Sequence, residues 1–186
     1  MKLVAYPLLF ALTVSAQAAT DDSIVSRLDS TLQAIDTETG PEPISLVIAV
    51  QANNKIQPAI LIDTRRIRSM LTQLIGSERA EVEVLSYGDR VRVLVAQPFT
   101  SDSAKAADAM AYLKISTGQS STSTTADAIT QAATDLETRP SNRRRIIVVL
   151  GENSNDRESA AKLKDTVNRA AGRLPNLVVY FPLALR

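Results

Sequence analysis

Hydrophobic positions along the chain follow two patterns: continuous runs typical of buried strands, and recurrences every three to four residues typical of amphipathic helices. Residues 44–50 read ISLVIAV, and an almost wholly apolar run of this length predicts a strand that is buried on both faces. Residues 146–150 read IIVVL and predict a second strand of the same kind. A third apolar segment, residues 177–181, predicts the last strand. Between these runs the pattern is that of helices.

Apolar residues at helical spacing predict a lead-in helix before the first strand and further helices after it. The lead-in helix carries Ile24, Leu28, Leu32 and Ile35 and is expected to end near Gly40. The later sets are Ile67, Met70, Leu71 and Leu74; Ala106, Met110 and Leu113; Ile129, Ala132, Ala133 and Leu136; and Leu163, Val167, Ala170 and Leu174. We expect Gly76 to adopt positive φ at the end of its helix, and Gly172 with Pro175 to close the last one.

Residues 81–95 alternate between polar and apolar side chains on both sides of a Tyr87-Gly88-Asp89 turn, which predicts a hairpin. Its second strand, Val91 to Val95, is expected to be an antiparallel edge strand. Strands that alternate with helices favour a parallel sheet covered on both faces. The sequence therefore predicts an α/β fold with a doubly wound, mostly parallel five-stranded sheet and one antiparallel edge strand, preceded by an N-terminal helix. In that sheet we expect residues 44–50 and 146–150 to be adjacent.

The N-terminal segment has the composition of a secretory signal peptide. Lys2 supplies a positive charge, residues 3–14 are apolar apart from Thr13, and Ala16-Gln17-Ala18 presents small residues at a cleavage site. The apolar core is shorter than the roughly 20 residues that a membrane-spanning helix needs. We therefore expect a signal peptide over 1–18, a helical lead-in over 19–41 and one domain over 42–186. The mature protein, starting at Ala19, is expected to be periplasmic or secreted, without stable insertion in a membrane.

The chain of 186 residues contains no cysteine and no histidine. This excludes thiolate and imidazole catalysis, disulfides, zinc sites of the Cys/His kind and haem ligation by either side chain. With 21 basic and 20 acidic side chains the net charge is +1, which argues against nucleic-acid binding. Neither a G-x-G-x-x-G nor a Walker A pattern occurs, so nucleotide binding is not expected. Carboxylate chemistry, a hard metal ion held by oxygen ligands, and binding without chemistry remain.

Several strings in the middle of the chain resemble the von Willebrand factor A domain family, and within it an exported bacterial group common in acidobacteria. They are residues 86–93 (SYGDRVRV), 97–100 (QPFT), 124–133 (TTADAITQAA) and 143–150 (RRRIIVVL). The resemblance covers residues 43–181. It implies a Rossmann-like sheet and a non-enzymatic, adhesion-type role in protein binding.

The resemblance also implies a metal-ion-dependent adhesion site, but this chain departs from the family pattern at its positions. The family site is built from an Asp-x-Ser-x-Ser run after the first strand, a Thr in the second loop and an Asp in the third. The corresponding residues here are Ala49, Gln51, Asn53, Ser123 and Glu152. Mg²⁺ prefers near-octahedral oxygen ligands with one or two carboxylates, and only Glu152 supplies one. We therefore expect a degenerate site with no metal and no cofactor.

A protein partner is then expected to be held directly by loop side chains, for which the candidates are Gln51, Asn53, Asn54, Ser123, Glu152 and Asn153. Three alternatives stay open: a Mg²⁺-dependent ligand-binding domain of the same family, a structural subunit of a cell-envelope assembly, and a hydrolase with Glu152 as general base. The hydrolase is disfavoured because the motif loops offer no second acid and no nucleophile.

Three other features have ordinary structural interpretations. Ser159 and Lys162 match a Ser-x-x-Lys pattern, but the companion motifs of penicillin-recognising enzymes are missing. The basic clusters at 65–68 and 143–145 are expected to be the outer face of a helix and a solvated loop, with a patch for an anionic partner as the alternative. Residues 123–125, and Asn153 or Asn155, are expected to cap the helices that follow them.

Overall fold

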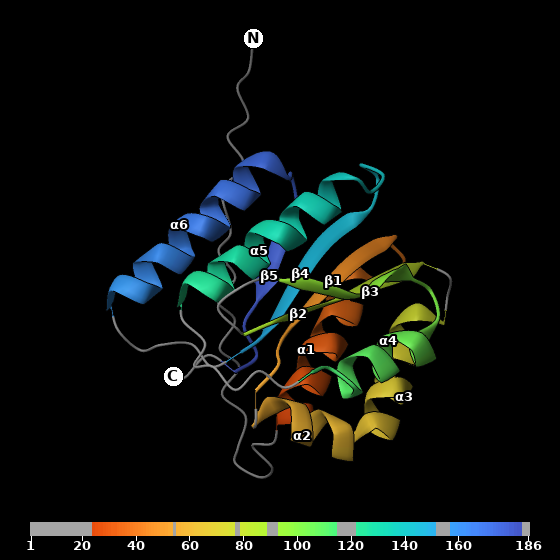
Figure 1. Ribbon diagram of the computed structural model, residues 1–186. Coiled ribbons are helices and arrows are strands. Elements are labelled where there is room, and N and C mark those ends of the chain that lie inside the picture. Colours follow the sequence, from red (N-terminus) through yellow and green to blue (C-terminus); the bar gives the residue numbers. More distant parts are fainter. Residues whose placement is uncertain are drawn as a thin grey trace.

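The computed structural model describes residues 24–53, 55–76, 79–88, 93–114, 122–151 and 157–183, with the backbone alone at 122, 123 and 157–159 (Figure 1). Helices and strands alternate along these residues, as the sequence pattern predicts. The helices are α1 (Ile24–Thr39), α2 (Ile56–Ile62), α3 (Thr64–Ile75), α4 (Ser103–Ala111), α5 (Thr122–Glu137) and α6 (Arg157–Arg173). The strands are β1 (Ile44–Gln51), β2 (Ala80–Tyr87), β3 (Leu94–Thr100), β4 (Arg144–Leu150) and β5 (Leu177–Tyr180).

The strands form one five-stranded sheet in the order β3-β2-β1-β4-β5. β1 pairs in parallel with β2 and β4, β4 pairs in parallel with β5, and β2 pairs with β3 in the antiparallel direction. Every side chain of β1 is buried, as its apolar sequence predicts. The predicted α/β sheet, with residues 44–50 beside 146–150 and one antiparallel edge strand, is therefore confirmed.

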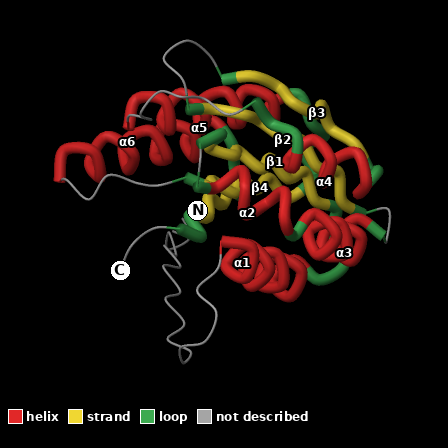
Figure 2. The backbone as a smooth tube through the Cα atoms, turned by 60° about the horizontal axis from the view of Figure 1, so that its bottom comes forward, coloured by secondary structure: helices red, strands yellow, loops and turns green. Residues whose placement is uncertain are grey.

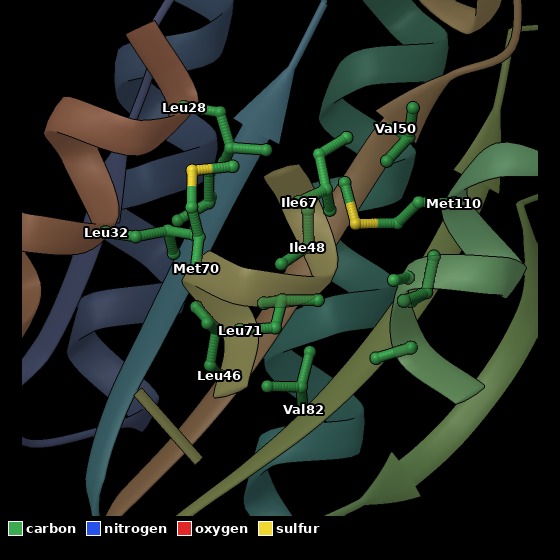
Figure 3. Close-up of a cluster of buried hydrophobic side chains, with 14 of the residues drawn as sticks. Leu28, Leu32, Leu46, Ile48, Val50, Ile67, Met70, Leu71, Val82 and Met110 are labelled. Atoms are coloured by element: carbon green, nitrogen blue, oxygen red, sulfur yellow. The ribbon is translucent and has the colours of Figure 1, made fainter. Parts of the chain in front are cut away.

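Helices cover both faces of this sheet (Figure 1 and Figure 2). Helices α1 to α4 pack on one face, where Leu46 and Ile48 of β1 meet buried side chains such as Leu28 and Leu71 (Figure 3). Helices α5 and α6 pack on the other face, against a second buried cluster that includes Val47. Successive side chains of a strand point to opposite faces of the sheet. A strand must therefore be apolar at every position to contribute to the buried clusters on both faces.

The lead-in helix α1 is confirmed, and it is fastened to the domain. Gly40, with a φ of 51°, follows its last turn, and the Arg79 guanidinium binds Asp36 and the Gly40 carbonyl. Tyr180 Oη of β5 donates to Glu38 Oε2 at 2.7 Å. Residues 1–23 lie outside the described residues, so the signal peptide and its cleavage before Ala19 stay predictions. Within the described part of the chain, no helix is long and apolar enough to cross a membrane.

The antiparallel edge strand lies further along the chain than its valine alternation predicts. That alternation placed it at 91–95, whereas β3 begins at Leu94 and pairs with β2 through register shifts. Pro98 lies inside the strand, which is possible because one side of an edge strand needs no hydrogen-bond donor. Leu94 and Val95 are both exposed, so the alternation of valine with other residues here does not correspond to a buried face of the strand.

Helix α3 ends at Ile75, beside Gly76 as predicted, but the predicted positive φ is wrong. Gly76 has a φ of −60°, and its N–H donates to the Thr72 carbonyl at 2.7 Å, so it extends the bonding of α3 without a left-handed turn. Helix α6 ends at Arg173, between Gly172 and Pro175 as expected, and the residue of positive φ beyond it is Asn176, at 64°. The sequence pattern also does not predict α2. Its Pro58 lies in the first turn, where backbone N–H groups have no acceptor within the helix.

Candidate functional site

The C-terminal ends of the parallel strands β1, β2 and β4 lie at the same edge of the sheet, which is where open α/β sheets bind ligands. Gln51 ends β1 and is paired with Tyr87, which ends β2. Gly151 follows β4 directly. The Ala52 N–H donates to the Tyr87 carbonyl at 2.8 Å and continues the strand pairing. The backbone of the candidate site is thus an extension of the sheet.

The Tyr87 side chain passes over the end of β1 and reaches the backbone beyond β4. A β carbon at Gly151 would overlap Tyr87 Oη and would lie 3.1 Å from Gln51 Oε1. Because β1 lies between β2 and β4, the ring must cross the end of β1 to reach that point. Only 3% of Tyr87 is exposed. Position 151 therefore requires glycine because the ring approaches it so closely.

The Tyr87 hydroxyl is a buried polar group at the centre of this contact. No atom of the described residues meets hydrogen-bond geometry with Tyr87 Oη. Burial raises the pKa of the phenol, and the nearby Thr125 hydroxyl of α5 offsets only part of that rise, so the group keeps its proton at neutral pH. Thr125 is also buried. A buried O–H donor costs stability unless another group accepts from it.

Ala49, the position that the resemblance gave for the family aspartate, lies inside the sheet. Its side chain is 0% exposed, within the apolar cluster beneath α5. β1 continues beyond it and ends at Gln51. A motif that follows the first strand therefore starts at Gln51 and continues through Asn53 and Lys55. Neither placement supplies a carboxylate from the first loop, so this loop by itself does not fit a hard dication.

Asn53 is engaged in local structure. Its Oδ1 accepts hydrogen bonds from the N–H groups of Lys55, at 3.0 Å, and Ile56, at 2.7 Å. These bonds fix the turn that begins α2, and together they use both acceptor positions of the amide oxygen. Asn53 therefore offers a partner its amide N–H₂ group and offers no oxygen to a cation.

The remaining candidates lie in parts of the chain that the structure does not describe. Asn54, Glu152, Asn153 and Asn155 lie outside the described residues, as does the side chain of Ser123. Because α5 begins at Thr122, residues 123–125 lie inside the helix, and the prediction that they cap it is wrong. Ser159 lies in α6, and its side chain is likewise outside the described part of the chain.

Sequence reasoning did not assign Tyr87 or Thr125 to the candidate site. The Tyr87-Gly88 pair was interpreted as a hairpin turn, whereas Tyr87 is the last residue of β2 and is buried. A signal for the contact existed in the glycine that follows β4, which a tyrosine at the end of a nearby strand would require. That signal becomes readable only once the strand order is known, because the two residues are on strands that are not neighbours.

The opposite edge of the sheet holds a paired polar network. Arg139 Nε and Nη2 donate to the two carboxylate oxygens of Glu81 at 2.7 and 2.5 Å, and Ser45 Oγ donates to Glu81 Oε1 at 2.6 Å. Arg143 Nε lies 3.2 Å from the same oxygen. Burial raises the pKa of Glu81, but the hydrogen bonds from Arg139 and Ser45 outweigh it, and the pKa is lowered.

This network corrects the interpretation of one basic cluster. Residues 143–145 were expected to be a solvated loop, but Arg145 is 7% exposed and donates to the backbone carbonyls of Leu136 and Arg139. The cluster at 65–68 is confirmed as the outer face of a helix, because its arginines are exposed on α3. Two of them form surface ion pairs, Arg66 with Asp29 and Arg68 with Asp108.

Comparison with known families identifies the domain. The model of the von Willebrand factor type A domain matches residues 56–153, just over half of the chain, from the start of α2 to the loop after β4. The chain belongs to the von Willebrand factor type A domain family. The match begins after the first loop, so positions 49, 51 and 53 lie outside it.

Two solved structures share this fold. The conserved hypothetical protein BatB from Bacteroides thetaiotaomicron is 20% identical, with a TM-score of 0.55 over 74% of this chain and 65% of BatB. An aerotolerance-related membrane protein from Bacteroides fragilis NCTC 9343, with multiple mutations to serines, is 17% identical, with a TM-score of 0.51 over 74% of this chain and 66% of that one. The chain thus spans less than two thirds of BatB. Among curated proteins no sequence match is found.

Proposed function

We propose that the chain is an exported, non-enzymatic protein-binding module of the von Willebrand A type that holds its partner without a bridging metal ion. In this proposal the partner contacts the loops at the C-terminal ends of β1, β2 and β4 directly. The fold and the family support the module, and the residues at this edge support the direct mode of binding.

The arrangement of the first loop carries the metal-independent part of the proposal. Ala49 is enclosed by apolar side chains, and the Asn53 amide oxygen is occupied by backbone N–H groups. Gln51 lies against the tightly packed contact between Tyr87 and Gly151. A dication at this loop would meet neutral amide oxygens in place of carboxylates, which does not compensate its charge.

The chemistry of the described side chains at this edge supports binding without catalysis. They are the amides of Gln51 and Asn53, the Lys55 side chain, the Thr125 hydroxyl and the Tyr87 phenol, whose pKa is raised by burial. A raised pKa prevents the phenol from acting as a base near neutral pH, and the chain has no histidine or cysteine to take that role. Nucleophilic catalysis also needs a base beside its nucleophile, and the described residues of this edge do not form such a pair.

Export is supported by the signal-peptide composition of residues 1–18. An exported binding module meets its partner in the cell envelope or outside the cell, and the near-zero net charge argues against nucleic acid as that partner. A protein of the envelope is therefore the partner class that we propose.

Capture from a cell-envelope extract, with the purified protein as bait, tests the proposal. We expect the same partner in Mg²⁺ and in EDTA. Lys55 is exposed on the first loop, so Lys55→Glu should weaken the binding of the captured protein by at least about tenfold, as reversal of one interface charge typically does. Lys164→Glu, at an exposed position in the middle of α6, is the matched control and should leave affinity unchanged.

Loss of the partner in EDTA would contradict the metal-independent mode. Unchanged affinity for Lys55→Glu, or an equal loss for Lys164→Glu, would move the interface away from the first loop.

A further inference from the structure

Helix α2 is apolar on the face that it exposes as well as on the face that it buries. Its seven residues, IQPAILI, carry no charge. Ile56 and Ile60 are buried in the core, whereas Leu61 is 44% exposed and Ile62 is 83% exposed. A surface helix is normally polar on its outer side, and a helix that is apolar all round normally lies in a core or against lipid. The exposed face of α2 is therefore unusual for contact with water.

A third exposed apolar side chain, Tyr112, lies beside this face. Gln57 Nε2 of α2 donates to the carbonyl of Ala111, the last residue of α4, at 2.6 Å (Figure 1). Tyr112 follows directly and is 75% exposed. Leu61 comes one turn after Gln57, on the same side of α2, because residues four apart share a helix face. The end of α4 thus brings the tyrosine to the side of α2 that carries Leu61.

The pairing of α3 with α4 gives the same placement. The two helices run antiparallel, as two side-chain contacts between them show: Arg68 with Asp108, and Thr72 with Ser103. This register places Tyr112 opposite Thr64, whose hydroxyl donates to the Leu61 carbonyl at 2.9 Å. Leu61, Ile62 and Tyr112 therefore form one surface, which we call the apolar patch. Single exposed apolar side chains are ordinary, whereas adjoining ones mark an interaction site.

Positive charge surrounds the apolar patch. Lys55 lies before α2, Arg65 after it and Lys114 beyond the end of α4, and all three are exposed. The carboxylate between them is that of Asp63, which is half-buried. The other two arginines of α3 near the patch each pair with an aspartate of a neighbouring helix. In a chain of near-zero net charge, an apolar surface with a positive rim is complementary to a partner that is both apolar and anionic.

We propose that the apolar patch adsorbs to the surface of an anionic lipid bilayer, with its three side chains between the headgroups and its basic rim at the lipid phosphates. Peripheral contacts with membranes combine apolar, aromatic and Lys or Arg side chains in this way. Ile62 stands out from the surface instead of lining a groove, whereas a peptide partner is typically held in a groove or at a sheet edge.

The adsorption is reversible, and it goes beyond the proposed function because it requires no protein partner. It does bear on that function through position. Helix α2 begins directly after the first loop, so a bilayer that contacts Ile62 also lies near the loop where we propose that the protein partner binds.

Cosedimentation of the purified protein with lipid vesicles tests the proposal. Vesicles of phosphatidylcholine with about 40% phosphatidylglycerol should bind the wild type. Vesicles of phosphatidylcholine alone should bind it at least about tenfold more weakly, because the exposed positive charges then lack anionic lipid. Raising NaCl to about 0.5 M should also weaken the binding, since salt screens exposed charges.

Two variants of the apolar patch and its rim locate the contact. Ile62→Ser should weaken binding to the anionic vesicles at least about tenfold, because burial of an isoleucine side chain contributes about that much. Arg65→Gln should weaken it about fivefold, the effect of one positive charge near the membrane. Both positions are exposed, so both variants should fold as the wild type does. The matched controls, Leu94→Ser on β3 and Lys164→Gln on α6, are also exposed and should keep the wild-type affinity.

Failure of the wild type to bind the anionic vesicles would overturn the proposal, as would equal affinities of the wild type and Ile62→Ser, or an equal loss in Leu94→Ser. Two other occupants of the apolar patch give distinct results, and either would also overturn it. A second copy of the chain would give a lipid-free dimer that Ile62→Ser abolishes. A protein partner would give a loss of envelope-protein capture in Ile62→Ser without any vesicle binding. The effect of Lys55→Glu on capture tests the proposed function separately, so the two can fail independently.

Discussion

The polar residues at the N-terminal and C-terminal ends of the parallel strands differ in their hydrogen bonding. On the face covered by α5, β2 presents Glu81 at its N-terminal end and Tyr87 at its C-terminal end. Both oxygens of Glu81 receive donors from arginine and serine side chains, whereas Tyr87 Oη receives none from the described residues. A fully satisfied network holds one arrangement of the chain, whereas a buried donor without a partner costs stability. Among the described residues, the N-terminal ends of the strands are therefore tied by polar contacts that the C-terminal ends, where open α/β sheets bind ligands, do not have at Tyr87.

The same contrast appears between two residues of one type on one strand. Glu81 and Glu83 are both largely withdrawn from water, and burial raises the pKa of each. Glu81 has Arg139 and Ser45 as donors, and its pKa ends below the usual value. Glu83 has none of these donors and a second carboxylate nearby, and its pKa ends near 7. Hydrogen-bond partners, and not burial alone, therefore decide whether the pKa of a glutamate on this strand rises or falls.

The largest effect is expected from breaking the N-terminal edge. Glu81→Ala leaves Arg139 and Arg143 without their carboxylate in a partly buried position, and removal of one partner of a buried pair costs about 3–5 kcal/mol. Urea unfolding near neutral pH measures the loss. Glu137→Ala is the control, since its pair with Arg173 is exposed and should contribute at most about 1 kcal/mol. A loss of similar size for the two variants would show that the network does not stabilise the fold.

A smaller effect is expected at the C-terminal edge. Gly151→Ala places a β carbon against Tyr87 Oη, and overpacking of this kind costs about 1–3 kcal/mol. Tyr87→Phe removes the oxygen and an unpaired buried donor, so alone it should be nearly neutral or slightly stabilising. In the Gly151→Ala background it should recover a large part of the loss, which a double-mutant cycle of unfolding free energies measures. Strict additivity would mean that the ring and position 151 do not touch.

The sequence predicted the sheet well because the signal for its central strands is strong and local. The runs at 44–50 and 146–150 are apolar on both faces, and only a position between two helical layers buries both. The edge strand was misplaced because β3 is largely exposed, so its apolar and polar side chains do not alternate between a buried and an exposed face. The end of α3 was predicted correctly, but the conformation of Gly76 was not, because glycine permits positive φ without requiring it.

The candidate site was predictable in its location and not in its composition. Gln51 and Asn53 were expected at this edge because a strand ends there and a polar loop follows. The contact between Tyr87 and Gly151 joins two strands with a third between them, so no local spacing reveals it. The hydrogen bonds of Asn53 to the start of α2 are local, but the sequence allows either a cap or a ligand at such an asparagine.

The smallest expected effect is that of metal ions on the stability of the wild type, and a variant with a restored motif should show a larger one. Millimolar Mg²⁺ or Mn²⁺ should not raise the melting temperature of the wild type, because the first loop supplies no carboxylate. Since β1 ends at Gln51, the family motif is best restored by Gln51→Asp with Asn53→Ser and Lys55→Ser. Binding to the native state alone would then stabilise this variant by about 2.7 kcal/mol at a hundredfold excess over Kd. The matched variant, Ala49→Asp with Gln51→Ser and Asn53→Ser, should instead be destabilised without gaining affinity, because its new carboxylate is buried among apolar side chains. A metal-dependent rise in melting temperature for the Ala49→Asp variant but not for the Gln51→Asp variant would show that the motif begins at Ala49. A rise in the melting temperature of the wild type would contradict the proposal that the site works without a metal ion.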